Sequence, residues 1–304
     1  MLDLDVLSEK YVQELKEIFN SKNWFTYDED VNEIFQRFCE RMSRLNDDSQ
    51  RDLIVELTKE YLWVPGSQYE AYLKKALMQL INENDFILNN NNTKNKVIVC
   101  PLVKNKNNVV KSGVFMAYLC QSILVQMLPM FERNKVRICM INDLKSYKES
   151  ISEMIILIDD YLGSGSTALE FLAELSGSIP NDKISIVCLV AQEEGINLLR
   201  QNQIRVYAAE KRKKAISDIY SELEAKRRKQ LMKQISKQLG VEDDSLLGYE
   251  ASESLVSMIR TPNNTFPFYW IEKKGNCCRA PFKRKTLYYD SDMKRNMDIN
   301  EKNK

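Results

Sequence analysis

The sequence feature that most constrains the fold is an apolar run that ends in two adjacent carboxylates. Residues 154–158 are Met, Ile, Ile, Leu and Ile, and Asp159 and Asp160 follow directly. An apolar run of this length is typical of a strand that is buried on both faces of a parallel sheet. Open α/β sheets bind their ligands at the carboxyl ends of such strands, so the two acids are candidates for a binding site.

The residues after the acids predict a tight turn and then a helix. Two glycines within residues 163–167 allow the backbone to pass close to a ligand, and apolar residues at helical spacing begin at Leu169. The amides of such a turn, with a helix N-terminus, can hold an anion. Two acids beside an anion site suit a ribose phosphate. An ordinary strand–turn–helix corner with solvated acids would also give this pattern.

Residues 154–167 resemble the phosphoribosyl-pyrophosphate (PRPP) loop of type I phosphoribosyltransferases. That family's pattern is an apolar strand, two acids, three variable residues, Ser or Thr, Gly, any residue, and Ser or Thr. The resemblance implies that Asp159 and Asp160 are the catalytic acids and hold the ribose hydroxyls, directly or through Mg²⁺. It also implies that the turn holds the 5′-phosphate through Gly163, Ser164, Gly165, Ser166 and Thr167.

Two further segments carry candidate ligand-binding residues. Lys111 and Ser112 precede a predicted helix, and in the transferase family the loop after the first sheet strand binds pyrophosphate. The resemblance therefore implies a pyrophosphate-binding role for both, with simple N-capping by Ser112 as the alternative. Asn263 and Asn264 precede an aromatic run that we expect to be strand-like. Their amides could contact a base or cover the site as a hood, or they could stabilise a turn before an edge strand.

The late segment 261–270, which reads TPNNTFPFYW, points to one branch of this superfamily. Together with the PRPP-loop pattern it resembles the phosphoribosyltransferase-like proteins of prokaryotic conflict and anti-phage systems (PRTase-CE-like effectors), some of them found beside retron reverse transcriptases. The resemblance covers roughly residues 50–285. It implies an effector that binds PRPP, a related ribose phosphate or a nucleotide with Mg²⁺. Such an effector transfers the phosphoribosyl group or degrades nucleotides in antiviral defence.

Periodicity predicts an α/β fold with a parallel, Rossmann-like, phosphoribosyltransferase-like sheet, preceded by an all-helical region. We expect a helical N-terminal region over 1–90, a phosphoribosyltransferase-like domain over 91–285 and a disordered tail over 286–304. Expected strands cover 96–102, 136–141, 154–159, 184–190 and 204–208, and expected helices cover 114–130, 166–175 and 195–201.

Composition excludes several classes of chemistry. The chain contains no histidine, which removes Ser-His and Cys-His nucleophiles and histidine metal sites. The seven cysteines are scattered, mostly in apolar runs, so we expect buried reduced thiols and a cytoplasmic protein. The net charge of +1 implies neither nucleic acid nor membrane as a partner, and no apolar run approaches the length of a membrane span.

Residues 209–239 form a basic segment that we expect to be a helical insertion. A solvated amphipathic helix, contact with the phosphates of a ligand or nucleic acid, and contact with a membrane surface all fit it. Two alternatives to an enzyme therefore stay open. One is a non-catalytic sensor of PRPP or nucleotides, because Gly163 stands where several transferases carry an acid that assists the base. The other is a component that binds nucleic acid or a reverse transcriptase. An oligomer is compatible with either.

Overall fold

The computed structural model of the chain describes residues 7–26, 31–84, 96–103, 111–146, 154–175, 179–272 and 279–284. At its centre lies a five-stranded sheet with the strand order β3-β2-β4-β5-β6, and every neighbouring pair is parallel. This confirms the expected α/β fold. The strands are β2 (Lys96–Pro101), β3 (Lys135–Ile138), β4 (Met154–Leu162), β5 (Ile184–Gln192) and β6 (Arg205–Arg212).

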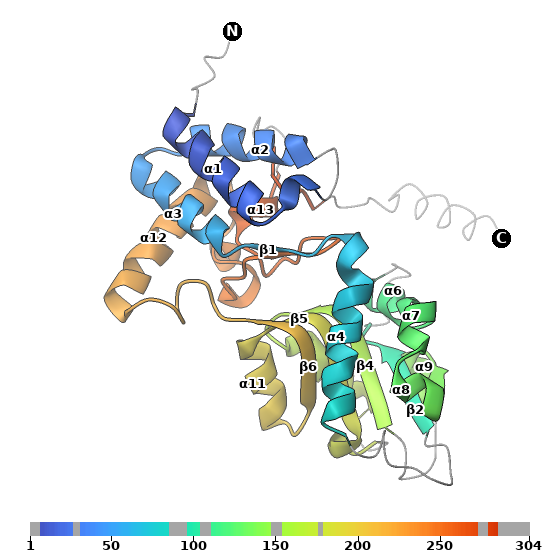
Figure 1. Cartoon of the computed structure of the whole chain (residues 1–304). Helices are drawn as coiled ribbons and strands as arrows, with labels where there is room; N and C mark the ends of the chain where they lie inside the picture. The colour runs from blue at the N-terminus through green and yellow to red at the C-terminus, as the bar shows by residue number, and fades with distance from the viewer. Residues whose placement is uncertain are drawn as a thin grey trace, which may run out of the picture.

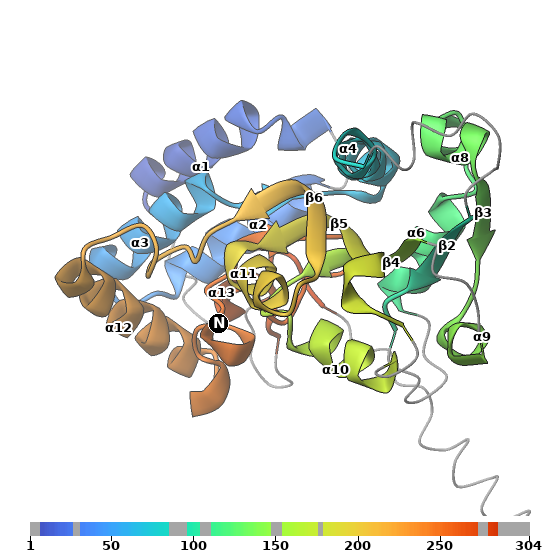
Figure 2. The same cartoon turned by 90° about the horizontal axis from the view of Figure 1, so that it is seen from below.

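Helices cover both faces of this sheet (Figure 2). One face carries α4 (Tyr69–Asn82), α6 (Ser112–Leu119), α7 (Ile123–Gln126) and α8 (Pro129–Arg133). The other face carries α9 (Ile141–Ser146), α10 (Ser166–Leu175) and α11 (Glu193–Gln201). Ile156 and Ile158 of β4 belong to the first core and Ile155 and Leu157 to the second. Because β4 is apolar on both faces, it occupies the middle of the sheet.

A third core, which is helical, joins the N-terminal helices to the C-terminal segment (Figure 1). It contains α1 (Glu9–Ser21), α2 (Val31–Ser43), α3 (Asp48–Lys59), α12 (Glu222–Gln238) and α13 (Pro267–Trp270). The buried Arg41 of α2 donates hydrogen bonds to the carbonyls of Phe268 (2.7 Å) and Ile271 (2.8 Å). Two short strands, β1 (Leu62–Trp63) and β7 (Val256–Ser257), pair in parallel next to this core. The N-terminal helices and the C-terminal segment therefore form one packed unit.

Several element boundaries differ from the sequence-based expectation. The single helix expected over 114–130 is three short helices, because Ser122 caps α7 through the Val125 amide (3.3 Å) and Pro129 starts α8. Strand β4 continues through the acids to Leu162, since residues 159–162 pair with β5. The aromatic run after Asn264 forms the short helix α13 instead of a strand.

The basic segment 209–239 is only partly helical, which corrects the expected insertion. Its first residues extend β6 to Arg212, because they continue the parallel pairing with β5, and α12 begins only at Glu222. Within the expected helical region 1–90, α4 packs on the sheet instead of on the other helices. The tail over 286–304 and the pair Cys277 and Cys278 lie outside the described residues.

The described cysteines bear out the expectation of reduced thiols. All of them are free, and Cys39 alone among them is more than marginally exposed; the others are Cys100, Cys120, Cys139 and Cys188. Among the helices that the structure describes, none is long and apolar enough to cross a membrane.

Candidate functional site

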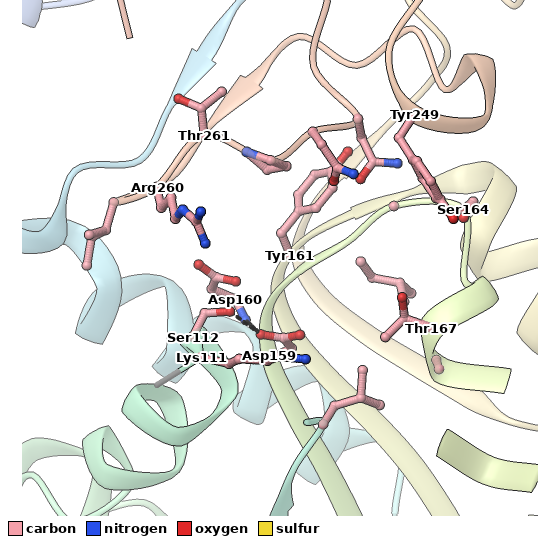
Figure 3. Close-up of a pocket in the computed structure, with 18 of the residues that line it drawn as sticks. Lys111, Ser112, Asp159, Asp160, Tyr161, Ser164, Thr167, Tyr249, Arg260 and Thr261 are labelled. Carbon is pink, nitrogen blue, oxygen red and sulfur yellow. Dashed lines mark hydrogen bonds between the residues drawn. The ribbon is translucent and has the colours of Figure 1, made fainter. Parts of the chain in front are cut away.

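A cavity of about 820 Å³ opens at the carboxyl end of β4 (Figure 3). Its walls come from the end of β4, from residues 163–167 (the phosphate turn), from the start of α6, from Tyr69 of α4 and from residues 259–264 (the hood segment). The volume lies in the range of ordinary small-molecule sites. Every residue that the sequence singled out as a ligand contact lines this one cavity.

Asp159 and Asp160, the acid pair, are fixed by hydrogen bonds from three directions. Ser112 Oγ donates to Asp159 Oδ1 at 2.7 Å, and the Asp160 amide donates to the same oxygen at 2.9 Å. On the other carboxylate, Tyr69 donates its hydroxyl proton to Asp160 Oδ2 at 2.9 Å. Both carboxylates line the cavity. Residues of β4, α4 and α6 hold them in position through these hydrogen bonds.

The acid pair is electrostatically unfavourable without a bound cation or donor. Burial and the neighbouring Asp160 charge raise the pKa of Asp159 well above its ordinary value, against the hydrogen bond from Ser112. Burial likewise raises the pKa of Asp160, against the hydrogen bonds from Ser112 and Tyr69. Adjacent carboxylates whose charged forms are disfavoured by burial, and at Asp159 also by the neighbouring charge, suit a divalent cation or a set of hydroxyl donors.

The residues of this cavity fit Mg²⁺ only in a site shared with a ligand. Among the described residues no group of three potential metal-ligating side chains comes together, and the acid pair provides two carboxylates. Mg²⁺ prefers oxygen ligands in an octahedron and usually keeps several waters besides one or two carboxylates and substrate phosphates. The acid pair meets that requirement.

The phosphate turn is built by close backbone packing. Gly165 has a φ of +86°, which favours glycine, and its carbonyl accepts the Leu169 amide at 3.0 Å as α10 begins. From α11, Gly195 packs so tightly on the turn that a Cβ there would lie 2.2 Å from the Gly163 carbonyl oxygen. The first amides of α10 follow directly, so the turn presents a helix N-terminus at the cavity.

The start of α6 contributes Lys111 and Ser112 to this cavity, and Ser112 lies on the opposite side of Asp159 from Thr167 (Figure 3). Lys111 is the N-cap residue of α6, and its side chain makes no capping hydrogen bond. The alternative that Ser112 simply caps a helix is wrong, because its hydroxyl donates a hydrogen bond to Asp159 instead.

The hood segment packs directly on the phosphate turn. Asn264 is buried, and a Cβ at Gly163 would lie 2.5 Å from its Nδ2 atom. The Asn264 carbonyl accepts hydrogen bonds from Ser252 Oγ (2.9 Å) and the Ser254 amide (3.2 Å). Asn263 is tied through its carbonyl to the Tyr249 amide at 2.9 Å. Both asparagines are thus held over the turn by their backbones.

Sequence reasoning missed several side chains of this cavity, among them Tyr69, Tyr249, Arg260 and Arg284. Tyr69 connects two walls of the cavity. Its hydroxyl donates a hydrogen bond to Asp160 and accepts one from the Ile259 amide at 3.0 Å. In the sequence it only begins an apolar helical stripe, which gives no functional signal. Arg260 directly precedes the 261–270 segment, but a lone arginine in a sequence carries no signal of its own.

Comparison with known proteins identifies the family. The family model PRTase-CE matches residues 43–284, which is most of the chain. Among solved structures, the crystal structure of orotate phosphoribosyltransferase from Aeropyrum pernix is similar at 15% sequence identity and a TM-score of 0.29, over 58% of this chain and 77% of that chain. No curated protein matches the chain. The extent of the family match, over the sheet, the cavity and the hood segment, shows that the chain belongs to the PRTase-CE family of phosphoribosyltransferase-like conflict-system effectors.

Proposed function

We propose that the cavity binds PRPP or a closely related ribose 5-phosphate compound together with Mg²⁺, and that the protein transfers the phosphoribosyl group or cleaves a nucleotide. One observation carries this proposal: the acid pair and the phosphate turn line a single cavity at the end of β4. Family membership supports it. In a conflict system, such a reaction would deplete or modify the nucleotides that an invading phage needs.

Each part of the cavity has a role in this proposal. Asp159 and Asp160 hold the ribose hydroxyls and share Mg²⁺ with the ligand. The amides of the phosphate turn, with the hydroxyls of Ser164, Ser166 and Thr167, hold the 5′-phosphate. A bound Mg²⁺ would supply neutralisation of the charge on the leaving pyrophosphate.

The two remaining walls complete the assignment. Lys111, with the N-terminus of α6, stabilises the pyrophosphate end of the donor. Asn263 and Asn264 contact the acceptor or exclude water from above. Because the chain has no histidine, catalysis would depend on positioning and charge stabilisation instead of on an imidazole base.

A non-catalytic sensor is the second candidate function, and the packing at Gly163 favours it. Several transferases carry an acid at this position, whereas here the space of its side chain is filled by Asn264. No general base can therefore act from residue 163. A sensor would bind ligand stoichiometrically and release no pyrophosphate or free ribose product.

The surface of α12 supports a third role, as a component that contacts nucleic acid or a reverse transcriptase. Lys226 and Lys233 are exposed on this helix. Arg228, by contrast, is committed to Glu56 and to Glu224 (2.7 Å) and is not available to a partner. This role is compatible with an enzyme, because an effector must be held silent until infection.

The turnover experiment separates an enzyme from a sensor. Purified protein is incubated with PRPP, Mg²⁺ and a pool of nucleotides and bases, and pyrophosphate and new products are followed by mass spectrometry. The test variant is Asp159→Asn with Asp160→Asn. The control is Asp182→Asn, an exposed carboxylate in the turn of residues 181–183 before β5, at the amino end of that strand. Product that disappears only in the double variant supports the enzyme, and activity retained in that variant would exclude the assignment.

A further inference from the structure

Two arginines that the assigned roles do not use line the same cavity. Arg260 belongs to the hood segment and Arg284 to the last described segment, 279–284. A hydrogen bond joins the two segments: the side-chain hydroxyl of Thr261, next to Arg260, donates to the Phe282 carbonyl at 3.0 Å. The fold therefore brings two guanidinium groups from distant parts of the chain to one wall.

This wall is rigid. Phe282 is buried and stacks on Tyr61 with ring centroids 5.0 Å apart and an interplanar angle of 9°. Its amide donates to the Tyr269 carbonyl at 2.8 Å. Next to it, the Arg284 guanidinium lies over the Trp270 ring at 5.5 Å. The side chain of Arg284 is thus positioned by an aromatic surface and not by a carboxylate.

The two cations line the same cavity, and the charge of one acts on the other. Burial, together with the neighbouring Arg260 charge, lowers the pKa of Arg284 to about 10. Among the described residues, no carboxylate forms a salt bridge with either guanidinium. Arg279, in the same segment as Arg284, shows the contrast, because it is neutralised by Glu33 (3.1 Å) and Glu40 (2.7 Å). Guanidinium groups that line a cavity without a salt-bridge partner favour an anionic ligand there.

We propose that Arg260 and Arg284 form a second anion site in this cavity, distinct from the phosphate turn, which binds a phosphate or carboxylate group of the bound ligands. Figure 3 shows Arg260 reaching into the cavity on the side of Asp160, across the acid pair from Thr167. A single ligand group cannot occupy both anion sites. The occupant is therefore either the pyrophosphate end of the donor or an acidic group on the acceptor. The inference rests on the proposed function for the identity of these ligands.

The first part of the test uses calorimetric titration of the full chain with ribose 5-phosphate, PRPP and inorganic pyrophosphate. The variants are Arg260→Gln and Arg284→Gln, with Arg200→Gln as the control. Arg200 is an exposed arginine near the far end of α11, so it matches the change in net charge. Arg260 is also exposed, so its variant tests the site without loss of the core. Melting temperatures verify that each variant is folded.

If the second site binds the pyrophosphate of the donor, both test variants weaken PRPP binding by about 10- to 100-fold and leave ribose 5-phosphate binding unchanged. If it binds the acceptor, PRPP binding is unchanged. With PRPP present, the wild type then binds an acidic compound more tightly than its neutral counterpart. The pairs to compare are nicotinate with nicotinamide, and orotate with uracil. That preference disappears in both variants. Either result supports the second anion site.

The inference is overturned if neither PRPP nor any of these acids loses more affinity in Arg260→Gln and Arg284→Gln than in Arg200→Gln. Failure of the proposed function gives a different result, since ribose 5-phosphate and PRPP then do not bind the wild type at all. In that case inorganic pyrophosphate still tests the arginines directly. A loss of pyrophosphate affinity in both variants supports the anion site, and an unchanged or absent affinity overturns it.

Discussion

Replacement of Gly163 by alanine tests whether the hood segment and the phosphate turn are packed as one unit. The added Cβ would lie 2.5 Å from Asn264 Nδ2 and 2.7 Å from its Oδ1, well inside van der Waals separation. The φ of Gly163 is outside the left-handed region, so alanine itself is not strained there. Overpacking of this kind is expected to lower the free energy of unfolding by about 1–3 kcal/mol.

A double-mutant cycle isolates this contact. In an Asn264→Ala background the three atoms nearest to the new Cβ are gone, so the cost of Gly163→Ala should fall close to zero, and the coupling energy should nearly equal the single-mutant cost. Gly165→Ala is the matched control, because its φ of +86° strains alanine whether or not Asn264 is present. Urea denaturation measures all four proteins of the cycle. Additive effects of the two substitutions would refute direct packing of the hood segment on the turn.

Four further outcomes follow from the same contacts. Tyr69→Phe removes a buried hydroxyl that donates a hydrogen bond to Asp160. Urea denaturation should show that the free energy of unfolding falls by about 1–3 kcal/mol, and an unchanged midpoint would argue against this hydrogen bond. Phe282→Ala leaves a cavity in the helical core, and the same measurement should show that the free energy of unfolding falls by about 3–5 kcal/mol. Removal of Mg²⁺ with EDTA should abolish the rise in melting temperature that PRPP produces, whereas a persistent rise would exclude a shared metal site. Charge reversal at Lys226 and Lys233 should weaken any retention on nucleic acid and reduce its salt dependence by about one unit of slope per contact, and unaltered retention would remove α12 from the interface.

The sheet and the position of the site could be predicted because their signals are local. The run before Asp159 carries its own strand pattern, and the spacing over 163–167 is contiguous in the sequence. The helix over 166–175 begins and ends as expected, since its apolar positions all face one core. Strand β4 extended further than expected because pairing with β5, a tertiary contact, overrides the turn propensity of the residues after the acids.

The parts of the site that sequence reasoning missed depend on contacts between distant residues. Tyr69 reaches Asp160 only because α4 packs on the sheet, across 91 positions of sequence. The arginine pair exists only because Phe282 anchors its segment beside Thr261. Helix α12 and the N-terminal helices share a core for the same kind of reason. Neither periodicity nor a motif in a single sequence predicts such contacts between distant residues.

The central claim is that one cavity holds a ribose 5-phosphate group between the acid pair and the phosphate turn. A crystal structure of the protein grown with ribose 5-phosphate and Mg²⁺ tests it most directly. The account predicts phosphate density at the amides of Gly165, Ser166 and Thr167, with the ribose hydroxyls or their metal at Asp159 and Asp160. Ligand density elsewhere on the protein, or a cavity that stays empty at a saturating ligand concentration, would contradict it.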